Sequence, residues 1–173
     1  SHEKAITIRY PRGEGVMPAW RTDFEEIQIG KGVQLLEGEE IAVLSIGHIG
    51  NEAIAACEAA QALGLKPALF DMRFVKPLDE ELLHRVFTQF KKVITVEDAA
   101  IQGGFGSAIV EFMVDHQYSS QVIRLGIPDE IIEHGEQKEL YALCGIDAKG
   151  ILAKIQANTI ALPAKNNPKA VVS

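Results

Sequence analysis

The chain is poor in cysteine and in positive charge. Its two cysteines, Cys57 and Cys144, form no Cys-x-x-Cys pair and have no histidine-rich neighbourhood, which argues against a disulfide framework and against a metal site. Lysine and arginine total 17 against 24 aspartates and glutamates, so the net charge is -7. An acidic balance of this kind makes nucleic acid and anionic membranes poor candidates as partners.

Long apolar runs are also missing. No stretch of about 18 consecutive apolar residues occurs, so we predict no membrane span, and the first residues lack the basic-then-apolar order of a signal peptide. Together with the unpatterned cysteines, this predicts a cytoplasmic protein. A length of 173 residues suits one domain with a piece of another.

What the sequence does contain is a repeated strand and helix pattern. The first predicted strand, residues 41–46, is apolar on both faces, as a central strand covered by helices should be. Short alternating segments at 27–29 and 33–36 and a turn at 37–39 precede it, and we expect a hairpin-like entry that sets an antiparallel strand beside a parallel sheet. Further strands are predicted at 67–70, 92–96 and 121–127, and helices at 51–63, 82–90, 105–116, 136–144 and 147–157.

Residues 71–79, Asp-Met-Arg-Phe-Val-Lys-Pro-Leu-Asp, join a predicted strand to a helix that Asp79 is placed to cap. The charges of Asp71, Arg73 and Lys76 therefore emerge at the carboxyl end of a buried strand, where ligands and partner domains of open α/β sheets usually dock. We expect Arg73 and Lys76 to meet carboxylates across a domain or subunit boundary rather than a substrate.

Two adjacent carboxylates, Glu97 and Asp98, follow the third parallel strand. Neighbours on an extended chain point apart, so we expect a helix cap or an interdomain contact rather than acid–base catalysis. The segment that begins at Gly104 starts like a dinucleotide fingerprint, but Ile109 stands where Gly or Ala is required. We therefore expect its glycines to permit a tight turn between the strand and the helix.

Two histidines, His48 and His134, lie on predicted loops beyond strand ends. Neither has a nucleophile or a third metal ligand nearby in the sequence, so we expect each to be a solvated or interface residue.

The first residues raise a sharper possibility. Residues 5–9 alternate like a strand, and the turn after them brings the guanidinium of Arg12 beside that of Arg9. Paired guanidinium groups suit a phosphate, because each donates two hydrogen bonds in a fixed geometry. From the residues alone, a surface ion pair is the stronger interpretation of these arginines.

Several motifs recur together in one order and spacing from about residue 6 to residue 155. In chain order they are Arg9-Tyr10-Pro11-Arg12-Gly13, Ile29-Gly30-Lys31-Gly32, Asp71-Met72-Arg73-Phe74-Val75-Lys76-Pro77-Leu78-Asp79, Val96-Glu97 with Gly103-Gly104-Phe105-Gly106-Ser107, and Gly126-Ile127-Pro128-Asp129. With these motifs the chain resembles the C-terminal part of the 1-deoxy-D-xylulose-5-phosphate synthase family.

The resemblance implies a homodimeric transferase that depends on thiamine diphosphate and Mg2+. Such enzymes condense pyruvate with glyceraldehyde 3-phosphate and release carbon dioxide, and their product serves isoprenoid, thiamine and pyridoxal biosynthesis. The positions of Arg9 and Arg12 match the arginines that hold the aldehyde's phosphate in this family. The implied fold is a three-layer α/β/α domain like the transketolase C-terminal domain, with a mixed five-stranded sheet and one antiparallel strand.

The resemblance also divides the chain. It implies the end of a pyrimidine-binding domain at 1–15 and a transketolase C-terminal-like domain at 27–162. The irregular pattern around Pro18 and Trp20 predicts a linker at 16–26, and the lack of periodicity from Pro163 onward predicts a disordered tail at 163–173. The family's cofactor, metal and catalytic motifs are missing from this sequence, so we expect the fragment alone to bind no cofactor, to hold no catalytic residue and to be inactive. Two alternatives stay open: part of another thiamine enzyme, such as a transketolase or a 2-oxoacid dehydrogenase β subunit, or a free-standing dimerisation or ligand-sensing module.

Overall fold

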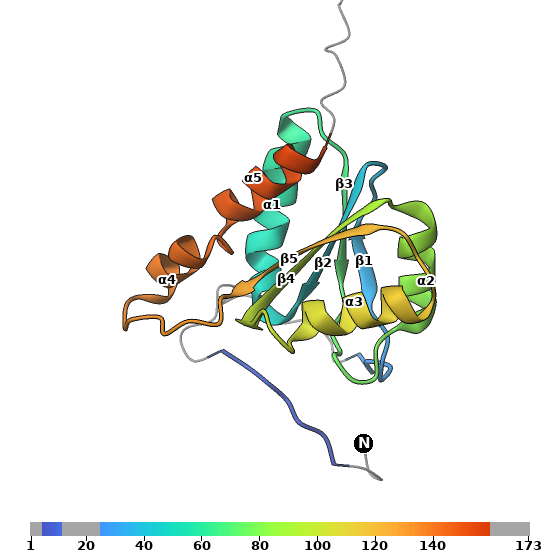
Figure 1. Cartoon of the computed structure of the whole chain (residues 1–173), viewed down its shortest axis with the longest axis horizontal. Helices are drawn as coiled ribbons and strands as arrows, with labels where there is room; N and C mark the ends of the chain where they lie inside the picture. The colour runs from blue at the N-terminus through green and yellow to red at the C-terminus, as the bar shows by residue number, and fades with distance from the viewer. Residues whose placement is uncertain (1–4, 12–24, 160–173) are drawn as a thin grey trace, which may run out of the picture.

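A five-stranded sheet between two layers of helices forms the body of the protein (Figure 1), which supports the predicted three-layer α/β/α architecture. The computed structural model describes residues 5–11 and 25–159; Arg12, most of the predicted linker and the predicted tail lie outside them. The elements in chain order are β1 (Val33–Leu36), β2 (Ile41–Ile46), η1 (Gly47–Ile49), α1 (Gly50–Ala62), β3 (Pro67–Asp71), α2 (Glu80–Gln89), β4 (Lys92–Ala100), α3 (Phe105–Asp115), β5 (Gln121–Ile127), α4 (Gln137–Cys144) and α5 (Ala148–Asn158).

The strand order is β1-β3-β2-β4-β5, and only the pairing of β1 with β3 is antiparallel. The mixed sheet is thus confirmed, but the predicted hairpin of residues 33–36 with 41–46 is wrong. The strand β2 is buried on both faces, and its two sides pair with β3 and β4, which leaves β1 the outer edge. The chain crosses the start of β3 at Gly38, where an added Cβ would lie 2.2 Å from the backbone nitrogen of Ala68.

Residues 5–11 belong to no strand, so the strand predicted at 5–9 is wrong for the part of the chain that the structure describes. The alternating apolar side chains of Ile6, Ile8 and Tyr10 are exposed rather than packed on a sheet. Within the described residues this segment pairs with neither edge strand of the sheet, β1 or β5 (Figure 1).

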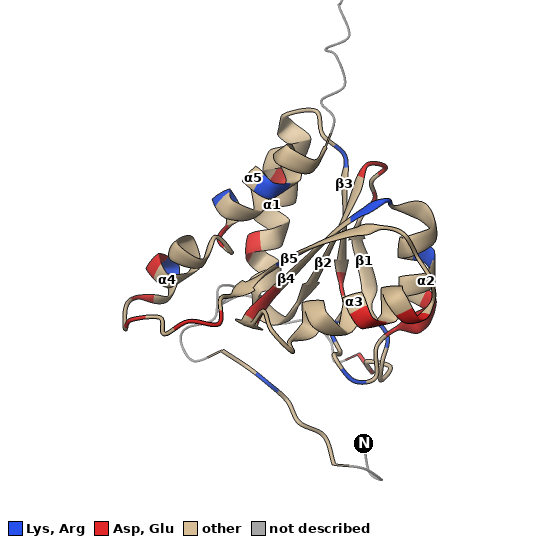
Figure 2. Cartoon of the chain, in the orientation of Figure 1, with Lys and Arg blue, Asp and Glu red and all other residues tan. Residues whose placement is uncertain are grey.

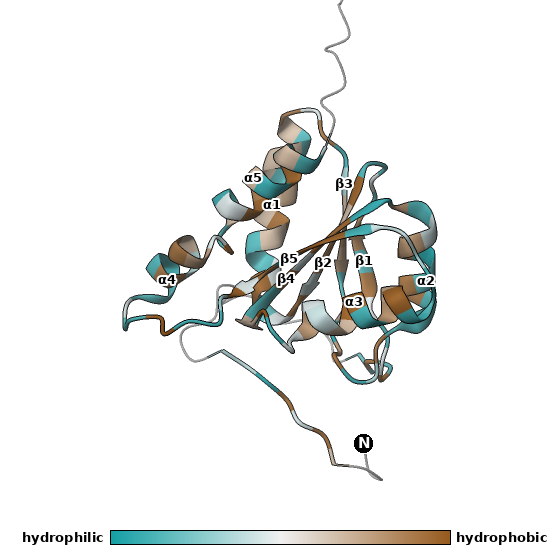
Figure 3. Cartoon of the chain, in the orientation of Figure 1, coloured by the Kyte–Doolittle hydropathy of each residue, from teal (hydrophilic) through white to brown (hydrophobic). Residues whose placement is uncertain are grey.

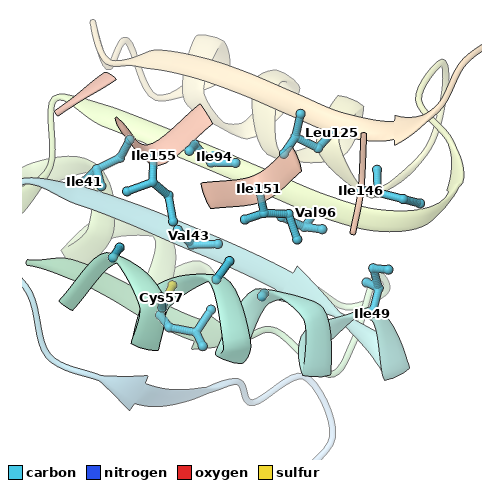
Figure 4. Close-up of a cluster of buried hydrophobic side chains, with 14 of the residues drawn as sticks. Ile41, Val43, Ile49, Cys57, Ile94, Val96, Leu125, Ile146, Ile151 and Ile155 are labelled. Atoms are coloured by element: carbon cyan, nitrogen blue, oxygen red, sulfur yellow. The ribbon is translucent and has the colours of Figure 1, made fainter. Parts of the chain in front are cut away.

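Alternate residues of the buried strands point to opposite faces of the sheet and pack in two separate hydrophobic cores. Ile41 and Val43 of β2 face α1 and α5 and pack with Ile151 and Ile155 (Figure 4), whereas Leu44 faces the other helical layer. Colouring by hydropathy shows brown along much of the strands and a mixture of brown and teal along the helices (Figure 3). None of the helices among the described residues has the length and apolar character that crossing a bilayer requires.

Side chains next to two helices confirm the predicted start signals. Asp79 accepts a hydrogen bond from the backbone N–H of Leu82 at 3.0 Å and so caps α2. Asp147 does the same for α5 through the N–H of Gly150 at 2.9 Å. Both helices therefore begin where the sequence places a capping aspartate.

Candidate functional site

The sheet changes direction between β2 and β4. From β2 the chain moves outward to β3, and from β3 it crosses back to β4 and then to β5 on the other side. In open α/β sheets, ligands bind beyond the carboxyl ends of the strands that flank such a point. His48 directly follows β2 and Asp98 lies near the end of β4, so both occupy this position.

A hydrogen-bonded cluster surrounds the carboxylate of Asp98. The hydroxyl of Tyr141 on α4 donates to Oδ2 of Asp98 at 2.9 Å, and the same hydroxyl lies 2.8 Å from Nε2 of His48. Gln137, one turn earlier on α4, donates to the Tyr141 hydroxyl at 3.1 Å. Burial and then the nearby Asp98 raise the pKa of Tyr141 above its usual value, so the hydroxyl keeps its proton for this bond.

Arg9 reaches the same carboxylate from the N-terminal segment. Its Nη2 donates to the backbone carbonyl of Asp98 and lies 3.6 Å from Oδ2 of that residue. The Arg9 side chain is 65% exposed, whereas that of Asp98 is 14% exposed. The structure therefore gives Arg9 the ion pair that its sequence context alone favours, on a carboxylate that the sequence does not indicate. Arg12 lies outside the described residues, so the structure does not place it.

A surface pocket of about 500 Å³ opens beside this cluster. The loop that joins β5 to α4 forms one wall, and acidic residues gather along that loop (Figure 2). The side chains of Asp98 and Glu133 supply negative charge at the pocket, and Ile127, Ile132 and Leu140 supply apolar wall. A site of this composition attracts a cationic group and repels an anion. His134 lines the pocket as well, away from the hydrogen bonds around Asp98.

The residues at this edge do not fit thiamine diphosphate with a metal ion. Among residues 5–11 and 25–159, no group of three or more His, Cys, Asp or Glu side chains could hold a metal ion. The carboxylates at the pocket would also oppose the charge of a diphosphate group.

Glu97 forms a helix cap, which is one of the two roles expected of it. Its carboxylate is 1% exposed and accepts the backbone N–H groups of Phe105 at 2.7 Å and of Gly106 at 2.8 Å, at the start of α3. A Cβ added at Gly104 would lie 2.1 Å from Oε2 of Glu97, so this turn requires glycine. The helix N-terminus that resembles a phosphate cradle is thus filled by the protein's own carboxylate.

The turn at 71–79 is a structural hub. Besides capping α2, Asp79 accepts the N–H of Gly32 at 3.0 Å and lies 3.4 Å from the ammonium of Lys31, which joins the segment before β1 to α2. Arg73 lies 3.9 Å from Asp71 within the turn itself. Its contacts among the described residues are therefore local, and its expected partner across a domain boundary stays a prediction.

The cluster of His48, Asp98 and Tyr141 is the feature that the sequence interpretation missed. A signal existed for two of its members, because the parallel strands 41–46 and 92–96 deliver His48 and Asp98 to one edge. No signal existed for Tyr141. An irregular loop of residues 128–136 precedes its helix, so the position of α4 relative to the sheet cannot be predicted from the sequence.

Comparisons with known proteins agree on one family. The model of the transketolase C-terminal domain matches residues 30–151. The 1-deoxy-D-xylulose-5-phosphate synthase of Cytophaga hutchinsonii is 60% identical over 151 residues, which cover 87% of this chain and 24% of that protein. The enzyme of the same name from Parabacteroides distasonis is 51% identical over 151 residues, with the same coverage. The chain thus spans about a quarter of the length of the curated relatives it matches.

Among solved structures, a split-gene transketolase described as an inactive β4 tetramer is similar. Its TM-score is 0.72 at 26% sequence identity, and the match covers 78% of this chain and 44% of that one. A transketolase from Pichia stipitis matches with a TM-score of 0.53 at 17% identity, covering 75% of this chain and 18% of that one, which supports the fold alone.

Proposed function

The chain belongs to the transketolase C-terminal domain family, and from that premise we propose that it is the C-terminal part of a 1-deoxy-D-xylulose-5-phosphate synthase. The observation that carries the proposal is the 60% identity to a synthase over 87% of this chain. A match of 151 residues in a chain of 173 includes most of the described domain.

In the full-length protein, the proposed reaction joins two carbons of pyruvate to glyceraldehyde 3-phosphate and releases carbon dioxide. Thiamine diphosphate with Mg2+ supplies the carbanion chemistry in this proposal, and the full-length protein works as a cytoplasmic homodimer. The residues at the edge of β2 and β4 do not fit that cofactor, so we assign it to other parts of the longer protein. The present chain then supports the fold and the dimer and turns over nothing by itself.

Arg9 and Arg12 are the substrate-binding residues in this proposal, and they hold the phosphate of the aldehyde. Support comes from Arg9, whose guanidinium is mostly exposed while one edge rests on Asp98. A guanidinium carries five N–H donors in a rigid fork, so one edge can bind a carboxyl group while another binds a phosphate.

The decisive experiment measures carbon dioxide release from pyruvate by the full-length enzyme, with and without glyceraldehyde 3-phosphate. We expect release that depends on the phosphorylated aldehyde, and we expect Arg9→Ala to raise KM for that aldehyde far more than KM for pyruvate. Transfer of a ketol group between sugar phosphates, without decarboxylation of pyruvate, would instead assign the protein to the transketolases, to which its structural likeness also points.

The proposed location of the cofactor has its own test. Calorimetric titration of the 173-residue chain with thiamine diphosphate and Mg2+ should give no binding in the micromolar range. Micromolar affinity would contradict the assignment of the cofactor to other parts of the longer protein.

A further inference from the structure

We propose that Asp98 is a positioning residue for Arg9, and that Tyr141 and His48 hold Asp98 in place for this role. The inference rests on the proposed function, because it takes Arg9 as a residue that binds the phosphate of the substrate. It adds residues from the C-terminal domain to a substrate site that the family resemblance places in the first fifteen residues.

Arg9 needs an external support. It lies in a segment that joins no strand, and its neighbours Ile8 and Tyr10 are exposed. A free arginine side chain loses rotamer entropy when a ligand orders its guanidinium, and a contact that orders the guanidinium beforehand lowers that cost. Among the described residues, Asp98 gives Arg9 both of its polar contacts, one through the backbone carbonyl and one through Oδ2. One residue therefore fixes the position and the orientation of the group.

Asp98 is well suited to that task because it is itself held. Its backbone lies in β4 next to Glu97, the last residue of that strand paired with β2, and its carboxylate receives the Tyr141 hydroxyl at 2.9 Å. His48 also contacts this carboxylate, with its Nδ1 at 3.6 Å from Oδ2 of Asp98. Three elements of the domain thus meet at one carboxylate, and Arg9 docks on a group that does not move freely.

A competing effect predicts the opposite outcome. A carboxylate beside Arg9 also neutralises part of its charge and repels an approaching phosphate. If this repulsion outweighed the ordering of the guanidinium, removal of the Asp98 charge would improve binding of the phosphorylated substrate. The sign of the change therefore decides between the two effects.

The test uses the full-length enzyme and separate KM values for the two substrates. Asp98→Asn keeps the size of the side chain but removes its charge, and we expect KM for the phosphorylated aldehyde to rise roughly fivefold while KM for pyruvate stays within about twofold. Asp98→Glu should recover part of the loss. Asp115→Asn, at the exposed far end of α3, is the matched control and should leave both constants unchanged.

A double-variant cycle separates positioning from mere support of the fold. If Asp98 acts through Arg9, the variant that carries both Arg9→Ala and Asp98→Asn should be no worse than Arg9→Ala alone. Tyr141→Phe, which removes one hydroxyl, should change KM for the aldehyde in the same direction by a smaller factor. It serves as the second probe if Asp98→Asn does not fold.

The outcomes are distinct. An unchanged KM for the aldehyde in Arg9→Ala would refute the substrate role of Arg9, and the positioning role with it. A raised KM in Arg9→Ala together with an unchanged or lowered KM in Asp98→Asn would overturn the positioning role alone. So would strictly additive effects in the cycle, or equal losses for pyruvate and the aldehyde.

Discussion

Replacement of Asp79 by alanine should destabilise the protein more than the loss of an ordinary helix cap. The carboxylate is 6% exposed, and it accepts two backbone N–H groups, from Leu82 and from Gly32, each at 3.0 Å. The first bond caps α2, whereas the second ties the segment before β1 to that helix. Lys31 adds a longer contact at 3.4 Å.

The magnitude follows from these three contacts. Loss of the cap costs about 1 kcal/mol. Loss of the Gly32 bond leaves a backbone donor unpaired, which costs about 1–1.5 kcal/mol. The Lys31 side chain is 44% exposed, so its contact adds only a few tenths of a kcal/mol, by analogy with other surface pairs. Asp79→Ala should therefore lower the free energy of unfolding by about 2–3 kcal/mol and Tm by roughly 8 °C.

The effect should also depend on pH. Burial alone would raise the pKa of Asp79, but the N–H groups of Leu82 and Gly32 together with Lys31 lower it below its usual value. A carboxyl group with a depressed pKa contributes its stabilisation fully above the pKa of the unfolded state, about 3.9, and loses it as the pH falls through the folded-state pKa. The difference between the wild type and Asp79→Ala should therefore shrink when the pH drops from 7 to 2.5.

Urea unfolding followed by far-UV circular dichroism at pH 7 and at pH 2.5 measures both effects. Asp79→Asn keeps an acceptor for the cap and should lose about 1 kcal/mol. Glu81→Gln is the matched control, because Glu81 contacts Lys31 at 2.8 Å but is 78% exposed, and it should change stability by less than about 0.5 kcal/mol. A loss below about 0.5 kcal/mol for Asp79→Ala at pH 7 would refute the reasoning.

Three further substitutions or reactions test the interior of the domain. Glu97→Ala removes a buried acceptor of two N–H groups at the start of α3 and should cost about 3 kcal/mol in a urea titration, several times the effect of Asp115→Ala. Thr95→Val should be neutral or stabilising by up to about 1 kcal/mol, because Oγ1 of Thr95 is buried and has no hydrogen-bond partner among the described residues. Burial and then Glu58 raise the pKa of Cys57 to about 12, so iodoacetamide at pH 8 should leave this thiol unmodified in the folded chain and alkylate it in urea, as mass spectrometry would show.

Each of these expectations has a clear contrary result. A loss below about 1 kcal/mol for Glu97→Ala would mean that water replaces the cap. A destabilisation above about 1 kcal/mol for Thr95→Val would mean that the hydroxyl has a partner in solution. Rapid alkylation of Cys57 in the native chain would mean that α1 opens locally.

The sequence predicts the central elements of the fold because their signals are local. Residues 41–46 are an apolar run and residues 121–127 a mostly apolar segment, both of strand length, and the structure forms strands over the same residues. The caps Asp79 and Asp147 lie within three residues of the N–H groups that they bind, so each can be predicted from its own helix. Burial and helix capping of this kind can be predicted without knowing which distant residues come into contact.

Features that depend on pairing between distant residues cannot be predicted from local sequence patterns. The alternation at 33–36 indicates a strand but not its partner, and the partner is β3, more than thirty residues away. The alternation at 5–9 indicates a strand although no strand forms there in the described structure. The sequence indicates a binding role for the guanidinium of Arg9. Its carboxylate partner, Asp98, is 89 residues away and can be identified only from the folded structure, in which β4 is in place.

The start of α3 is capped by Glu97, a residue of the preceding strand, and this has a consequence for the order of folding. The helices α2 and α5 carry their own capping aspartates, so each can form a first turn while the rest of the chain is still unfolded. The start of α3 contains Gly104 and Gly106 and no capping side chain of its own, and it depends on Glu97 from the preceding strand. That carboxylate reaches its place only after the turn at 101–104 closes, so nucleation of α3 should follow the docking of β4 rather than precede it.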